Sequence, residues 1–160
     1  MAPAHATVRR LLAVVIAIAM SSCGKTYHGY QYRPYTVRGQ HYVPLAPRDA
    51  IGLRERGMAS WYNEHSFLWF GGKTSLGEGY RSGAMAGAHK TLPLPCKVRV
   101  TNLHNGRKTV VRLNDRGPFV AGRIIDLTPA AARQLGFREQ GIAPVEMEVL
   151  SVGDGRWRVR

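Results

Sequence analysis

Four side chains in this sequence have the types and spacing that catalysis uses: Glu78, His89, Asp115 and Asp126. Asp115 lies in a turn that contains a Gly-Pro pair, and this pair forces the chain to reverse direction. Asp126 stands near the end of a short apolar run that is typical of a strand. Two carboxyl groups on neighbouring loop and strand ends are what a reaction at a glycosidic bond uses. Acid–base chemistry on a sugar is therefore the first hypothesis.

Taken singly, each of these residues is explained as well by a structural role. Glu78 lies between two glycines, and an isolated glutamate in such a loop is usually solvated. Asp115 could cap its own turn, and Asp126 could satisfy amide groups near the start of a helix. His89, beside an apolar run, could be a buried histidine with satisfied hydrogen bonds. The surrounding elements must therefore decide whether the four residues meet.

The pattern of apolar residues predicts short strands and one short helix. Thr128 and Pro129 fit the N-cap and first position of a helix over 130–135, and Gly136 fits its end. Asn105-Gly106 is a strong hairpin signal. Strands are expected over 58–62, 97–101, 108–113, 123–127, 145–150 and 157–159. Six or more short strands with one helix favour a small closed β-barrel.

Composition narrows the classes of partner. The chain has 160 residues and a formal net charge of +13, which favours an anionic partner. The basic residues are scattered without a dense block or a helical stripe, so nucleic-acid binding is not expected. No spacing of Cys or His fits a metal site, and no cofactor is expected. A disulfide between Cys23 and Cys96 is not the first choice, because their contexts differ.

The first 22 residues have the features of a signal peptide. Arg9 and Arg10 precede an apolar run over 11–20 that is too short for an ordinary membrane span. The sequence Met-Ser-Ser-Cys that ends at Cys23 resembles a lipobox, which predicts a lipid anchor on Cys23. An uncleaved anchor and a plain signal peptide are the alternatives. Gly24, rather than Asp, follows the cysteine, which favours the outer over the inner membrane of a bacterial envelope.

The remaining chain divides into a tether and a domain. Residues 23–55 are rich in Tyr, Arg and Pro, and they are predicted as an extended tether in which 37–43 could form a hairpin. The barrel domain is expected over 56–152. Residues 153–160 form the C-terminal end, which includes the strand expected over 157–159. A monomer is expected.

Several motifs appear in one order along the domain: 57–62, 74–78, 88–93, 98–102 with 105–107, 114–119 and 122–127. Together they resemble the rare lipoprotein A (RlpA) family of bacterial envelope proteins over roughly residues 36–151. This resemblance implies a mainly β protein, a six-stranded double-psi β-barrel with one or two short helices. It also implies a lytic transglycosylase that cleaves the MurNAc–GlcNAc β-1,4 bond of peptidoglycan, preferably in strands without stem peptides, and leaves a 1,6-anhydro end.

The resemblance assigns roles to individual residues. Either Asp115 or Asp126 is expected to donate the proton, with Glu78 as its partner. His89 is expected to orient a carboxylate or to bind substrate. Side chains expected to bind the glycan or restrain its loops are Trp61, Tyr62, Tyr80, Arg116 and Arg123.

The sequence departs from the family in places. Ser75 and Leu76 replace the usual Ala and Asn, and Gly87 stands where Thr is common. The chain ends at Arg160 without the SPOR domain of many relatives, so septal recruitment is not carried over. An expansin-like binding module without bond cleavage, a hydrolase and a structural envelope lipoprotein remain the alternative functions.

Overall fold

The protein is described by a computed structural model that covers residues 31, 33–62, 72–153 and 157–158. The predicted signal peptide, the lipidation site Cys23 and the start of the tether lie outside the described residues. No helix within these ranges is both long and apolar enough to span a bilayer.

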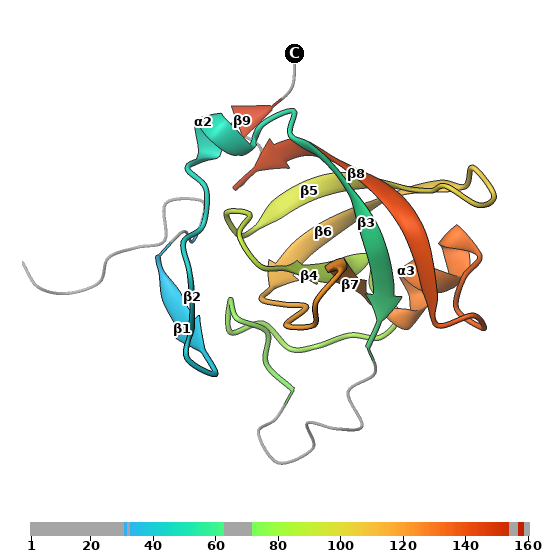
Figure 1. The fold of residues 1–160 in the computed structure, drawn as a ribbon, viewed down its shortest axis with the longest axis horizontal. Coiled ribbons are helices and arrows are strands. Elements are labelled where there is room, and N and C mark those ends of the chain that lie inside the picture. The colour runs from blue at the N-terminus through green and yellow to red at the C-terminus, as the bar shows by residue number, and fades with distance from the viewer. Residues whose placement is uncertain (1–30, 32, 63–71, 154–156, 159–160) are drawn as a thin grey trace, which may run out of the picture.

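Six strands close into a barrel (Figure 1). Around the barrel the strands follow the order β3, β7, β4, β6, β5 and β8, and β8 pairs back onto β3. The pairs β3–β7 and β4–β6 are parallel, whereas the other barrel pairs are antiparallel. The barrel strands are β3 Arg54–Trp61, β4 Ala86–His89, β5 Cys96–Asn102, β6 Lys108–Asp115, β7 Arg123–Leu127 and β8 Ile142–Val152. The predicted six-stranded barrel is confirmed.

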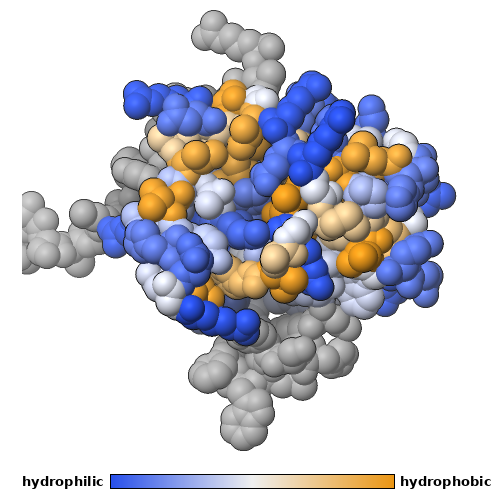
Figure 2. All heavy atoms as spheres, in the orientation of Figure 1, coloured by the Kyte–Doolittle hydropathy of each residue, from blue (hydrophilic) through white to orange (hydrophobic). Residues whose placement is uncertain are grey.

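Alternating side chains fill the interior of the barrel. In β5, Val98 and Val100 are buried while the residues between them face solvent, as expected for a strand with one apolar face. β8 alternates in the same way over most of its length. Figure 2 shows that hydrophobic residues on the visible outer face are broken up by hydrophilic ones.

Helix α3, Pro129–Leu135, begins one residue after the end of β7, with Thr128 between them. The Thr128 side chain accepts a hydrogen bond from the amide of Ala131, and Gly136 ends the helix at a φ of 75°. This cap and this stop are the ones that the sequence predicts. Because α3 starts so soon after β7, the helix fixes the position of the backbone that follows Asp126.

The segment predicted as an extended tether contains ordered elements. A hairpin of β1 Tyr35–Val37 and β2 Gln40–Tyr42 packs beside the barrel, and a short helix α2 Pro47–Ala50 follows (Figure 1). The extended tether therefore does not reach residue 55. β9, Trp157–Arg158, pairs with the end of β8 outside the closed ring.

Candidate active site

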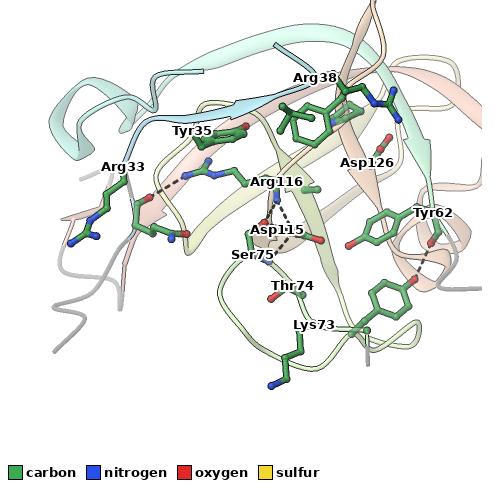
Figure 3. A pocket seen from close by; sticks show the side chains of 18 of the residues that line it. Arg33, Tyr35, Arg38, Tyr62, Lys73, Thr74, Ser75, Asp115, Arg116 and Asp126 are labelled. Atoms are coloured by element: carbon green, nitrogen blue, oxygen red, sulfur yellow. Dashed lines mark hydrogen bonds between the residues drawn. The ribbon is translucent and has the colours of Figure 1, made fainter. Parts of the chain in front are cut away.

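A cavity of about 890 Å³ lies where one end of the barrel meets the hairpin β1–β2 (Figure 3). Its walls come from the hairpin, from the loop that follows residue 72, and from the loop 115–119 after β6. Asp115 and Asp126 both line this cavity. Its volume lies within the range of about 300–1,000 Å³ that is usual for small-molecule sites.

Strand pairing places the two aspartates on either side of Ala88. In the barrel, β4 lies between β6 and β7, and Ala88 pairs with Asp115 on one side and with Asp126 on the other. Paired residues on neighbouring strands project to the same face, and each strand step is about 4.8 Å. The aspartate backbones are thus about 10 Å apart. The small methyl group of Ala88, which also lines the cavity, leaves the space between the two carboxyl groups open.

Asp126 is half-buried, and a serine holds one of its oxygens. Ser60, its partner across β3 and β7, donates a hydrogen bond from Oγ to Asp126 Oδ1. Arg123 Nη1 in turn donates to Ser60 Oγ over 3.1 Å. Burial raises the pKa of Asp126, and the Ser60 hydrogen bond and the charge of Arg123 only partly oppose it. Asp126 is therefore the carboxyl group in this cavity that is suited to hold a proton.

Asp115 is held by three donors at a single oxygen. Its Oδ1 accepts from the Ser75 amide at 2.9 Å, from Ser75 Oγ at 2.5 Å and from the Arg116 amide at 2.8 Å. No described residue donates to Oδ2. The described residues thus fix the carboxylate through Oδ1.

Glu78 lies beside the cavity but does not line it. It lines a neighbouring pocket of about 160 Å³, where both guanidinium ends of Arg112 bind its oxygens at 2.6 and 2.7 Å. Asn114 Nδ2 donates to it over 2.9 Å. The bidentate Arg112 hydrogen bonds lower the pKa of Glu78, so it is a carboxylate at neutral pH. The expectation that Glu78 is the direct partner of the proton donor therefore does not fit this geometry.

The ion pair with Arg112 gives Glu78 a different role. Glu78 closes a tight hairpin in which the Thr74 amide donates to the Glu78 carbonyl over 2.8 Å. Gly77, at a φ of 78°, makes the reversal possible. The same hairpin carries Ser75, which holds Asp115. Glu78 is therefore a positioning residue for the loop that fixes Asp115.

His89 does not line the cavity. Its side chain is buried, and Nδ1 accepts hydrogen bonds from the amides of Thr91 and Leu92 at 3.1 Å each. The other nitrogen, Nε2, therefore carries the proton, and it faces Glu55 Oε2 at 3.2 Å. Nδ1 therefore holds the turn after β4, whereas Nε2 pairs with Glu55 of β3. His89 does orient a carboxylate, but that carboxylate, Glu55, does not line the cavity.

Of the predicted aromatic platform, Tyr62 and Tyr80 line the cavity and Trp61 does not. Trp61 points to the other side of β3 and packs against the core, where its Nε1 donates to the Arg138 carbonyl over 2.8 Å. The guanidinium of Arg138 lies 5.5 Å from the centre of the indole ring. Trp61 is thus a packing residue in this structure.

Tyr62 projects into the cavity (Figure 3), and its ring packs against that of Tyr80 with 5.2 Å between the ring centres. Tyr80 donates a hydrogen bond to the Tyr62 carbonyl over 2.8 Å. Burial, together with the charges of Asp115 and Asp126, raises the pKa of Tyr62. Its phenol therefore keeps its proton at any physiological pH and can donate a hydrogen bond to a ligand.

Arg116 holds the loops together. Its guanidinium donates to the backbone carbonyls of Leu92 at 2.6 Å and Gln31 at 3.2 Å, and it lies under the Tyr35 ring at 5.3 Å. The sequence suggested restraint of the loops as one of two roles for Arg116, and these contacts favour it. Ser60 and Ser75 were not predicted as contributors to the site, and the hairpin was expected only as a possible part of the tether. Within the described ranges, no group of His, Cys, Asp or Glu is arranged to hold a metal ion.

Comparisons of the sequence with known proteins identify its relatives. Residues 54–147 match the family model described as "Lytic transglycolase". An "Endolytic peptidoglycan transglycosylase RlpA" of Campylobacter jejuni is 47% identical over 121 residues, which are 76% of this chain and 42% of that protein. Proteins of the same name from Pseudomonas aeruginosa and Neisseria meningitidis are 51% and 46% identical, over 72% and 79% of this chain. The chain spans 32% and 51% of those two proteins, respectively.

Proposed function

Since its residues 54–147 match that model, the chain belongs to the lytic transglycolase family, and we propose that it cleaves the glycan strands of peptidoglycan. The observation that carries this proposal is the pairing of Asp115 and Asp126 with opposite sides of Ala88 in one open cavity. Two carboxyl groups in different environments are the arrangement that glycosidic-bond chemistry uses. The 1,6-anhydro product and a preference for strands without stem peptides are finer parts of the same proposal.

Asp126 is the general acid in the first step. Its burial favours the protonated form, so it can donate a proton to the glycosidic oxygen as the bond from that oxygen to C1 of the muramic acid breaks. The leaving sugar keeps the donated proton. Positive charge then develops on C1 and the ring oxygen.

The second step regenerates the acid. The Asp126 carboxylate takes the proton of the C6 hydroxyl group while O6 forms a bond to C1. The product is a 1,6-anhydro sugar, and water is not consumed. One acid therefore serves both steps, which is why a second carboxyl group at a fixed glycosidase spacing is not required.

Asp115 and Tyr62 assist this reaction. The Asp115 carboxylate, fixed by Ser75 and Arg116, provides negative charge opposite the cationic centre. The neutral Tyr62 phenol donates a hydrogen bond to the sugar, and its ring and that of Tyr80 supply an apolar face for it.

The test uses purified protein that lacks residues 1–23, incubated with peptidoglycan sacculi and with strands stripped of peptides. Release of 1,6-anhydro products that is lost in Asp126→Asn supports the proposal. Sedimentation with sacculi without any product favours a binding module instead. Products with reducing ends identify a hydrolase.

The site of action is a separate part of the proposal. Cys23 carries a lipid anchor, and the protein faces the periplasm from the outer membrane rather than the inner one. Support comes from the lipobox-like sequence before Cys23 and from Gly24 after it. Labelling with a radioactive fatty acid, followed by membrane fractionation, tests this proposal. Label that persists in Cys23→Ala, or a wild-type protein found in the inner membrane, contradicts it.

A further inference from the structure

The hairpin before the barrel forms one wall of the active-site cavity. It precedes residues 54–147, which match the family model. The cavity-lining residues contributed by this segment are Gln31, Arg33, Pro34, Tyr35, Val37 and Arg38. A substrate in the cavity therefore meets side chains from outside the barrel as well as the two aspartates.

Specific contacts fix this wall relative to Asp115. Tyr35 donates from its hydroxyl group to the Lys90 carbonyl over 2.7 Å, and its ring stacks on Tyr42 with 5.2 Å between ring centres. Phe119, in the loop that follows Asp115, packs against both rings, with centres 6.3 and 5.5 Å away. Arg116 ties the same loop to the Gln31 carbonyl. The hairpin and the Asp115 loop are thus one packed unit.

Arg38 stands at the tip of this hairpin in an uncommon conformation. Its φ of 49° makes it the single described residue other than glycine with a positive φ, and Gly39 follows at 78°. A left-handed conformation is unfavourable for a residue that carries a side chain. Arg38 nonetheless lines the cavity (Figure 3). No carboxylate of the described residues pairs with its guanidinium.

The cavity is lined by both acidic and basic side chains. Asp115 and Asp126 supply carboxyl groups, whereas the cations Arg33, Arg38 and Lys73 lie among the lining residues without an acidic partner in the described ranges. A carboxylate on the ligand would be repelled by Asp115 and attracted to these cations. An anionic group of a bound glycan would therefore lie beside one of them.

We infer that Arg38 binds a carboxylate carried by the glycan strand, and that the hairpin β1–β2 is a substrate-binding element. This inference rests on the proposed function for the identity of the ligand. The carboxylate belongs either to the lactyl group of a muramic acid without peptide or to a stem peptide. Both sources share the chemistry that a guanidinium recognises.

The test compares Arg38→Ala with Arg48→Ala, because Arg48 is an exposed arginine on α2 that does not line the cavity. Dissociation constants are measured for three glycans: strands with intact peptides, strands freed of peptides, and peptide-free strands whose carboxylates are converted to amides. Binding is measured separately from product release, so a wild-type protein that binds but releases no product contradicts the proposed function and not this inference.

Arg38→Ala is expected to weaken binding about three- to tenfold for a carboxylate-bearing glycan and not for the amidated one. Arg48→Ala should leave all three constants unchanged. An effect on peptide-free strands identifies the lactyl carboxylate, and an effect on intact strands alone identifies the peptide. An equal loss for the amidated glycan, or a change below twofold for every glycan, overturns the inference.

Discussion

Asp115 and Asp126 pair with the same residue, Ala88, from opposite sides of β4. Their environments differ, because Asp126 is half-buried beside Ser60 while Asp115 is held at one oxygen by three donors. Two carboxyl groups in one cavity with separate environments are suited to separate roles.

Replacing Asp126 with Asn should remove activity and stabilise the fold. Loss of the proton donor is expected to lower kcat by about 10²–10⁴. Burial raises the pKa of Asp126, so the folded state binds this proton more tightly than the unfolded state does. The free energy of unfolding of the wild type therefore falls as the pH rises from the pKa of Asp126 in the unfolded chain to its pKa in the folded protein. Asp126→Asn should therefore have a higher Tm than wild type at pH 7, with a smaller difference at pH 3. The control is Asp49→Asn, because Asp49 is exposed on helix α2. A Tm for Asp126→Asn below that of the wild type at pH 7 would contradict this prediction.

Replacing Ser60 with Ala should shift the pH profile of activity. Ser60 donates to Asp126 Oδ1, and this hydrogen bond lowers the Asp126 pKa. Its removal raises that pKa further, so the fall in activity on the alkaline side should move to higher pH. The measurement is kcat against pH, with Ser151→Ala in β8 as the matched buried serine. An alkaline limb at the wild-type pH would show that Asp126 is not the titrating donor.

Replacing Glu78 with Gln should reduce activity less than the loss of Asp126 does. Without the bidentate pair with Arg112, the loop that presents Ser75 to Asp115 is less well fixed. We expect a loss of about ten- to hundredfold in kcat, from misplacement rather than from a missing reacting group. The control is Glu146→Gln, which breaks the Arg56 pair outside the cavity. A loss as large as that of Asp126→Asn would restore Glu78 to a catalytic role.

The same substitution should change stability in a pH-dependent way. The Glu78 pKa is lowered, so its stabilising contribution is present above the unfolded pKa and is lost as pH falls through the folded one. Wild type should have the higher Tm at pH 7, and the difference should shrink toward pH 2–3. A difference that stays constant with pH would show that the charge of Glu78 does not contribute.

Replacing His89 with Ala should destabilise the protein while leaving the chemical step largely intact. The amides of Thr91 and Leu92 lose their acceptor, which costs about 1–3 kcal/mol. Urea unfolding measures this loss, and kcat well below the Tm should stay within about threefold of wild type. A hundredfold loss of kcat at unchanged stability would support the catalytic role that the sequence suggested.

The sequence predicts the elements that local chemistry determines. Thr128, Pro129 and Gly136 mark the ends of α3, because capping and the left-handed stop depend on residues within one or two turns. The strands that contain Val98 and Val110 are predicted by the alternation of apolar and polar residues and by the hairpin turn at Asn105-Gly106 between them. These local signals, combined with the family resemblance, are sufficient for the barrel.

The sequence predicts some of the side chains that line the cavity, such as Asp115 and Asp126, but not all of the site. Ser60 and Trp61 are neighbours in β3, so only one of them can point toward the cavity. The register of β3 decides which one does, and this register shifts between Met58 and Ala59. Glu78 meets Arg112 only through the fold, since the two are 34 residues apart. The hairpin at Tyr35 lies in a composition typical of a linker, and its order comes from packing on Phe119.

The central claim is that one acid, Asp126, cleaves the glycosidic bond without water. The most direct measurement is mass analysis of the products formed from peptide-free strands in water labelled with oxygen-18. The account predicts 1,6-anhydro ends without the label, and no product from Asp126→Asn. Labelled reducing ends, or anhydro product formed at the wild-type rate by Asp126→Asn, would contradict it.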